Sequence, residues 1–174
     1  MILTGPEIKR QRSLGRITID PFNAGQINPN SYNYRLGSEI LELQDRGFDP
    51  KKRGRFKRYC IKEDGIVLRP GKNYLAHTLE TMGSDYYVTS LIGRSTIGRM
   101  GLWLQVTADL GHVGTKHKWT LEMKVVQPLR VYAGMEIGQV SFWKVLGKPL
   151  FYSGKYACDI CATPSRIQEE FYFS

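Results

Sequence analysis

The sequence contains no long apolar run and no recognisable leader segment. No stretch approaches the ~18 consecutive apolar residues that a membrane-spanning helix requires, so we expect no membrane contact. Residues 1–7 lack a charged leader followed by an apolar stretch, which argues against a secretory signal. Together these absences lead us to expect a cytoplasmic protein.

Cysteine and histidine are scarce, with three of each in the chain. Cys60, Cys158 and Cys161 are too few for the disulfide framework of a secreted protein. Cys158 and Cys161 have the Cys-x-x-Cys spacing of redox pairs and half zinc sites, but no second pair supplies four zinc ligands. Their surroundings also lack the strand-then-helix pattern of redox pairs, so the sequence favours neither a metal nor a redox role.

Acidic residues are outnumbered, since 25 Lys and Arg face 16 Asp and Glu and leave a net charge of +9. Such a balance favours anionic partners, either nucleic acid or phosphorylated small molecules. Residues 46–62 hold eight of the cations, interrupted by glycine and proline, a composition typical of an exposed hairpin or loop. This loop is either merely solvated or a contact for phosphate or nucleic acid.

The chain has 174 residues, 41% of them hydrophobic, and no internal repeat. This is enough to bury a core, and we expect one domain over residues 1–174. The start is predicted to be helical, because Thr4 and Glu7 have capping-box spacing and Pro6 suits a first turn. Gly15 is expected to end this helix.

Short strand patterns separated by glycine and proline dominate the rest of the sequence. In the clearest of them Trp119, Leu121, Met123 and Val125 alternate with polar residues. The pattern predicts an all-β fold, a barrel or jelly roll with one or two short helices. The expected strands cover residues 16–20, 38–43, 66–68, 73–79, 86–92, 118–126 and 137–145.

Residues 93–101, Gly-Arg-Ser-Thr-Ile-Gly-Arg-Met-Gly, indicate a strand that leads into one or two helical turns. Ser95 is predicted to cap this helix and to leave its hydroxyl, that of Thr96 and free backbone N–H groups as an anion site. Arg94 and Arg99 add guanidinium groups that match phosphate geometry. From these residues alone, an ordinary capped helix with two surface arginines is an equally good interpretation.

The same segment resembles the Arg-Ser-Ser phosphate motif of dCTP deaminases and dUTPases. Further matches to this family follow in family order: residues 31–37, 68–71, 106–108, 120–122, 132–139, 154–156 and 163–167. The chain is thus similar, over nearly its whole length, to the dCTP deaminase branch of the dUTPase-like trimeric superfamily. The resemblance implies a distorted β-barrel or jelly roll of the dUTPase-like type, a homotrimer with sites at subunit boundaries, and a tail at about residues 150–174 that closes over phosphates.

Hydrolytic deamination of cytosine needs water attack at C4, proton delivery to N3 and departure of ammonia, and one carboxylate can serve all three steps. The resemblance gives this role to Glu122, whereas its position alone favours a solvent-facing strand glutamate. It also implies that Ser95 and Arg99 orient and polarise the water. The substrate-binding residues that it implies are Arg94, Ser95, Thr96, Thr107, Ala108 (through its carbonyl, to the 4-amino group), His112, Tyr152, Lys155, Tyr156 and Asp159. Mg²⁺ would arrive bound to the nucleotide phosphates.

Three positions depart from the family pattern. His112 replaces an aspartate that is the hydrolytic base in dUTPases and a sugar contact in dCTP deaminases, which argues against simple dUTPase activity. Asp159 replaces a phosphate-binding glutamine, and a carboxylate there is repulsive unless magnesium intervenes. Asn33 replaces an aspartate in the early strand motif, where a structural role is expected.

Three functions remain open. The first is a deaminase that converts dCTP to dUTP and ammonia. The second is a deaminase that also releases dUMP, or that accepts a modified or differently phosphorylated cytosine nucleotide. The third is a nucleotide-sensing or nucleic-acid-binding protein on the same scaffold. Zinc is not expected, because no His-x-Glu or Cys-x-Glu precedes a Pro-Cys-x-x-Cys motif.

Overall fold

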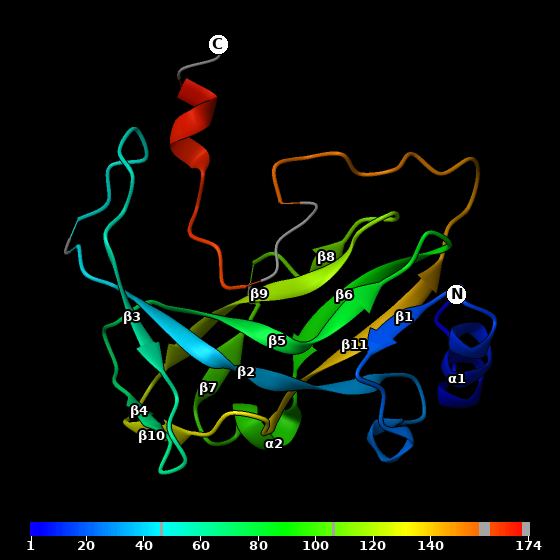
Figure 1. Ribbon diagram of the computed structural model, residues 1–174, viewed down its shortest axis with the longest axis horizontal. Helices are drawn as coiled ribbons and strands as arrows, with labels where there is room; N and C mark the ends of the chain where they lie inside the picture. The colour runs from blue at the N-terminus through cyan, green and yellow to red at the C-terminus, as the bar shows by residue number, and fades with distance from the viewer. Residues whose placement is uncertain (46, 106, 157–160, 172–174) are drawn as a thin grey trace.

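The structure is a computed structural model and describes residues 1–45, 47–105, 107–156 and 161–171. Strands make up most of its regular structure (Figure 1). The helices are α1 (Gly5–Ser13), η1 (Ala24–Gln26), α2 (Ser95–Gly98) and η2 (Ile167–Phe171). The strands are β1 (Thr18–Asp20), β2 (Tyr32–Leu43), β3 (Phe56–Cys60), β4 (Ile66–Leu68), β5 (Tyr74–Gly83), β6 (Tyr87–Gly93), β7 (Leu102–Leu104), β8 (Leu110–Gly111), β9 (Lys116–Val125), β10 (Leu129–Val131) and β11 (Glu136–Lys144).

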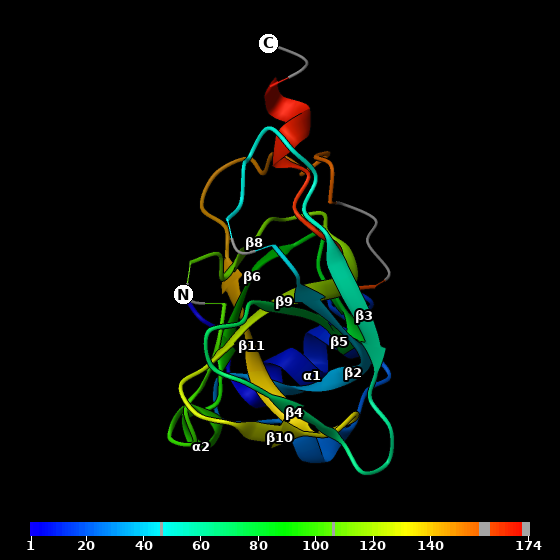
Figure 2. The same ribbon diagram turned by 90° about the vertical axis from the view of Figure 1, so that its left-hand side faces the viewer.

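Within the described residues, nine strands form one antiparallel sheet in the order β7-β9-β5-β2-β11-β6-β8, with β1 paired to β5 and β3 to β2. Strands β7 and β8 lie at opposite ends of this order, yet only residues 105–109 separate them along the chain. So short a segment spans at most about 20 Å, which requires the sheet to curl until its two ends approach each other. Figures 1 and 2 show this curl. The predicted all-β class is therefore confirmed, and the 105–109 segment bridges the seam.

The alternation predicted for residues 118–126 is present in β9. Leu121, Met123 and Val125 point into the core, whereas Glu122 and Lys124 are exposed on the opposite face. Because side chains alternate between the two faces of a strand, burying the apolar set fixes Glu122 on the outer face. Packing of the apolar side chains of β9 in the core therefore determines that the Glu122 side chain points away from it.

A buried ion pair joins β2 to β5. Glu80 is fully buried, and its carboxylate accepts hydrogen bonds from the Arg35 side-chain Nε at 2.6 Å and backbone N–H at 2.8 Å. The hydrogen bond to Glu80 raises the pKa of Arg35. A buried carboxylate is tolerated only when it is paired in this way. Arg35 belongs to the early strand motif, but its partner lies 45 residues away in the sequence.

Several local predictions were wrong in detail. The N-terminal helix is present, but Thr4 makes no side-chain capping bond. Glu7 instead accepts hydrogen bonds from Arg10 and Gln11, and the contact with Arg10 lowers the pKa of Glu7 to about 2. The strand expected at residues 38–43 begins at Tyr32, because tertiary pairing with β11 extends it. The short strands β3, β7, β8 and β10 were not predicted.

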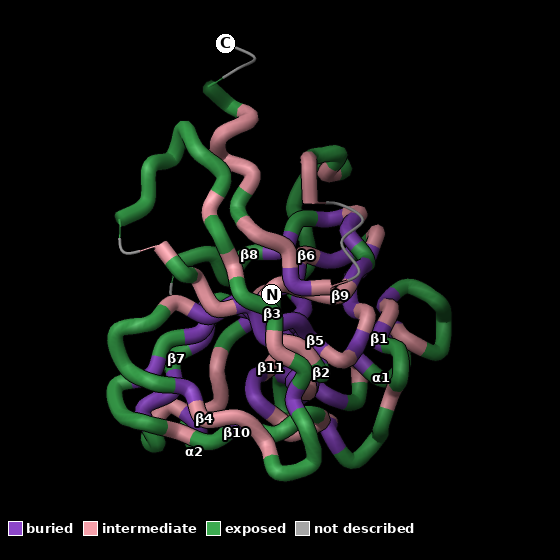
Figure 3. The backbone as a smooth tube through the Cα atoms, turned by 60° about the vertical axis from the view of Figure 1, so that its left-hand side comes forward, coloured by how far each residue is buried: buried purple, intermediate pink, exposed green. Residues whose placement is uncertain are grey.

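The described part of the basic segment, residues 47–62, comprises the loop of the hairpin between β2 and β3, β3 itself and the two residues after it. Its tip is exposed and rises beside the C-terminal segment, where Lys51 Nζ lies 5.9 Å from the centre of the Phe171 ring (Figure 3). Arg46 lies outside the described residues. Among the described residues, no helix is long and apolar enough to cross a membrane.

Candidate active site

The candidate general acid–base residue, Glu122, lies beside the segment that bridges the seam of the sheet. The Thr107 hydroxyl donates a hydrogen bond to Glu122 Oε2 at 3.3 Å. The Gln105 side chain accepts a hydrogen bond from the Glu122 backbone N–H at 2.8 Å and donates one to the Ala108 carbonyl at 3.2 Å. The structure therefore brings together Glu122, Thr107 and Ala108, three of the residues predicted from the sequence. Val106, between them, lies outside the described residues.

Gln105 was not among the site residues predicted from the sequence, although it contacts both Glu122 and Ala108. The residue follows β7, is 8% exposed and has a φ of 48°, in the left-handed region that non-glycine residues seldom adopt. Its position just before the 106–108 match was the only available signal. Nothing in the residue type indicated that its amide would contact Glu122.

The predicted phosphate segment forms the single turn of α2 at the end of β6. The prediction that Ser95 caps this helix was wrong, because Arg94 takes the N-cap position without a side-chain capping bond and Ser95 is the first helical residue. Ser95, Thr96 and Arg99 are exposed, whereas Arg94 is half-buried. Tyr34, whose pKa is raised by burial, donates a hydrogen bond to the Ile92 carbonyl and so fixes the strand end from which α2 starts.

Arg94 is held by a network that reaches across three segments of the chain. Its guanidinium group forms an ion pair with Glu136 Oε2 at 2.9 Å and donates to the Glu136 backbone carbonyl at 3.2 Å. Asn33 donates from Nδ2 to the same Oε2 at 2.8 Å and accepts from Asn28 at 2.6 Å. The network accounts for the asparagine at position 33, because an aspartate there would place a second carboxylate against Glu136. A phosphate that binds Arg94 shares it with this carboxylate.

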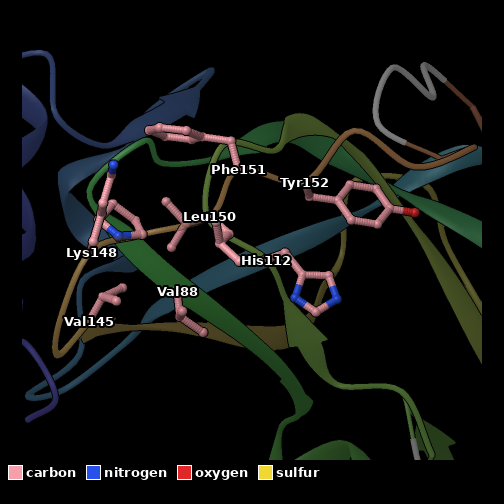
Figure 4. Close-up of a pocket in the computed structure, with 9 residues that line it drawn as sticks. Val88, His112, Val145, Lys148, Leu150, Phe151 and Tyr152 are labelled. Carbon is pink, nitrogen blue, oxygen red and sulfur yellow. The ribbon is translucent and has the colours of Figure 1, made fainter.

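His112 and Tyr152 lie at a different place in the chain. Their rings stack with centroids 5.2 Å apart, and the Tyr152 N–H donates to the Val113 carbonyl at 3.1 Å. They border an open pocket of about 460 Å³, which side chains of β6 and of residues 145–151 also line (Figure 4). Gly111 pairs with Thr89, four residues before the end of β6, so His112 and α2 are separated by about 13 Å or more along this strand.

The C-terminal segment lies against the outer face of the sheet. Ala162 is buried against Leu41 and Leu75, and the Thr163 N–H donates to the Thr120 hydroxyl at 3.1 Å. Leu75 is the cross-strand partner of Glu122, and Thr120 precedes Glu122 by two residues on the same face. Residues 162 and 163 therefore cover the surface next to the candidate carboxylate.

The other predicted residues of this tail contact each other. Lys155 forms an ion pair with Glu170, which raises the pKa of Lys155, and donates to the Arg166 carbonyl at 3.3 Å. The Tyr156 hydroxyl accepts from the Arg166 N–H at 2.9 Å. Asp159, together with Cys158, lies outside the described residues.

The predicted residues that the structure describes thus fall into four groups within one chain. Glu122, Thr107 and Ala108 form the first, α2 with Arg94 the second, His112 with Tyr152 the third, and Lys155 with Tyr156 the fourth. Gly101 lies between α2 and β7, and its carbonyl accepts a hydrogen bond from the Val126 N–H at 3.0 Å, just beyond the end of β9. This bond links the segment after α2 to the strand that carries Glu122. Within the described ranges, no hydrogen bond or ion pair connects Glu122 directly to α2.

The curled antiparallel sheet, with few short helices and with the Glu122 carboxylate on its outer face, is the distorted β-barrel expected of the dUTPase-like fold class. Comparisons with known proteins support the same family. The family model described as dCTP deaminase-like matches residues 2–145. Over 98% of this chain and 99% of the relative, the sequence is 47% identical to "dCTP deaminase, dUMP-forming" of Clostridium acetobutylicum. A protein of the same name from Hathewaya histolytica is 41% identical over 98% of this chain and 99% of its own length.

The chain therefore belongs to the dCTP deaminase-like family, and the predicted resemblance is confirmed. The expectation of an enzyme is confirmed with it. A solved structure, that of 2′-deoxycytidine 5′-triphosphate deaminase from Agrobacterium tumefaciens, is similar with a TM-score of 0.65 at 21% identity. The match covers 81% of this chain and 47% of that longer one, and at this identity it supports the fold alone.

Proposed function

We propose that this protein deaminates dCTP and releases dUMP, so that dCTP and two water molecules give dUMP, ammonia and pyrophosphate. The main observation is the Glu122 carboxylate, held beside Thr107 and the Ala108 carbonyl at the seam of the sheet. The two relatives at 41% and 47% identity, both named dUMP-forming, favour the second of the three alternatives over release of dUTP.

In this proposal Glu122 accepts a proton from the water that attacks C4 and delivers it to N3. It then transfers the proton of the new C4 hydroxyl to the 4-amino group, so that the C4–N bond breaks, ammonia leaves and the C4 carbonyl of uracil forms. The exposed side of Glu122 is available to a nucleotide base, because its hydrogen bonds to Gln105 are made by its backbone. The Ala108 carbonyl accepts a hydrogen bond from the 4-amino group and so distinguishes cytosine from uracil. Ser95 and Arg99 orient and polarise the water.

The phosphates, with their bound Mg²⁺, are proposed to contact Arg94, Ser95 and Thr96. Arg94 is suited to this because Glu136 holds its guanidinium group in place before any ligand binds, and Asn33 in turn holds the Glu136 carboxylate. Position 112 carries histidine, so the release of pyrophosphate does not use an aspartate there as its base. The stacked His112 and Tyr152 rings instead offer a flat surface and a ring N–H to the sugar or a phosphate.

The product distribution tests the proposal directly. Purified protein incubated with dCTP and Mg²⁺ is expected to yield ammonia, pyrophosphate and dUMP in equal amounts, measured by chromatography and a coupled ammonia assay. Ammonia with dUTP as the final product would support the first alternative. Binding of nucleotide or nucleic acid without turnover would support the third.

We also propose that the active protein is a homotrimer of one-domain chains whose sites combine residues of neighbouring copies. Two observations support this: the predicted residues are divided into four separate groups within one chain, and several large apolar side chains are exposed on the sheet and its edges. The most exposed of these within strands are Trp103 at 52% and Leu110 at 58%, which lie on β7 and β8 beside the seam. Exposed apolar area of this kind commonly marks an interface.

Light scattering of the purified protein at micromolar concentration is expected to give three times the mass of one chain. Placing a charge at the seam by Trp103→Glu should reduce this mass and lower turnover together, whereas Lys9→Glu, on the exposed side of α1, should leave both unchanged. A wild-type protein with the mass of one chain and full turnover would contradict the composite site.

A further inference from the structure

Gln105 occupies an unusual conformation for a reason visible in its contacts. Among the described residues, it is the only non-glycine residue with a positive φ, and it is buried. A residue is kept in this sparsely populated region only when surrounding interactions hold it there. Such positions frequently mark functional sites, which makes the partners of Gln105 informative.

One amide group links two parts of the candidate site. The β7–β9 ladder ends with the Leu104–Met123 pair, and the Gln105 N–H then donates to the Glu122 carbonyl at 3.2 Å. In place of a further backbone acceptor, Gln105 Oε1 accepts from the Glu122 N–H at 2.8 Å. The Nε2 of the same amide donates to the Ala108 carbonyl at 3.2 Å. A single planar group therefore sets the position of the Glu122 backbone relative to the Ala108 carbonyl.

We propose that Gln105 is a positioning residue for deamination, a role that rests on the function proposed above. It fixes the separation between the carboxylate that moves the proton and the carbonyl that meets the 4-amino group. Errors of about 1 Å in such a separation can cost about 100-fold in rate, so a rigid link has a clear kinetic value. The left-handed turn at Gln105 allows its side chain, rather than the following backbone, to face Glu122.

The chemistry of the side chain explains why glutamine suits this position. Only an amide presents an acceptor to the Glu122 N–H and a donor to the Ala108 carbonyl in one plane. Glutamate has the same size and keeps the acceptor, but it turns a second oxygen toward the Ala108 carbonyl. Glycine tolerates the positive φ and removes both side-chain bonds, so any loss in that variant does not come from backbone strain.

Steady-state kinetics with dCTP test the role of Gln105. In Gln105→Glu and Gln105→Gly, kcat is expected to fall about 10- to 100-fold while KM changes less than threefold, because the phosphate contacts are untouched. Calorimetric binding of dCTP shows that the variants remain folded. Gln44→Glu, the same change at an exposed position just after β2, is the matched control and should keep the wild-type kcat.

The pH dependence tests whether the side chain at position 105 lies close enough to Glu122 to act on its carboxylate. In Gln105→Glu a second carboxylate lies near Glu122 and opposes its ionisation, so the acid limb of the kcat profile should move to higher pH. A kcat within threefold of wild type and an unmoved acid limb in this variant would overturn the positioning role alone. Absence of turnover in the wild-type protein would instead overturn the proposed function, and this role with it.

Discussion

Glu122→Gln is expected to reduce deamination of dCTP by about 10²- to 10⁴-fold, the usual contribution of a general acid–base group. The substitution keeps the size of the side chain and an oxygen that can accept the Thr107 hydrogen bond, so the local structure should persist. It removes the ability to take a proton from water and return it to the base. Nucleotide affinity, measured by calorimetry, should change little.

The matched control for this experiment is Glu63→Gln, which makes the same change at an exposed glutamate on a loop outside the sheet. It should retain wild-type turnover and separate loss of the catalytic carboxylate from loss of surface charge. If Glu122→Gln kept more than about a tenth of the wild-type rate, the assignment of the general acid–base role would be incorrect.

Asn33→Asp is expected to destabilise the protein by about 1–3 kcal/mol at neutral pH, the usual cost when a buried hydrogen bond is lost and its partner is left unsatisfied. Asn33 is 6% exposed, and its Nδ2 donates to Glu136 Oε2. Aspartate still accepts from Asn28 but donates nothing, and it places a second anion against Glu136. Chemical denaturation measures the loss, and KM for dCTP should rise because Arg94 then faces two carboxylates.

Two further variants make this prediction specific. Asn30→Asp adds the same charge at an exposed position in the preceding loop and should change stability by less than about 0.5 kcal/mol. The exchange Asn33→Asp with Glu136→Gln removes the facing pair of carboxylates and supplies a new donor to position 33, but it also removes the ion pair of Arg94 with Glu136, so only part of the lost stability should return. Equal instability of the single and the exchanged variants would show that the hydrogen bond is not responsible.

The sign of the pH effect follows from the chemistry. In Asn33→Asp the two facing carboxylates raise each other's affinity for a proton in the folded state. The folded state then binds more protons than the unfolded state in mildly acidic solution, so the variant gains stability relative to wild type as the pH falls. Its deficit should therefore be largest at neutral pH and should shrink below about pH 5.

The sequence by itself determined the fold class and the location of the candidate carboxylate. Strict alternation over residues 118–126 predicts that one face of that strand is buried. Residues two apart lie on the same face, so the apolar side chains are buried as one set. Glu122 must then lie on the opposite face. Short strands punctuated by glycine and proline likewise indicated the all-β class, and the ordered motif matches identified the family.

Only the tertiary structure decided which residues support those found from the motifs. Asn33 and Glu136 are 103 residues apart, and the Glu122–Gln105 contact spans 17 residues. Such pairs depend on the register of strands β2, β7, β9 and β11, which local sequence does not encode. The turn at Gln105 and the place of Arg94 at the start of α2 depend in the same way on contacts made elsewhere. Local patterns decide which face of a strand is buried, whereas the curl of the sheet decides which distant side chains meet at its seam.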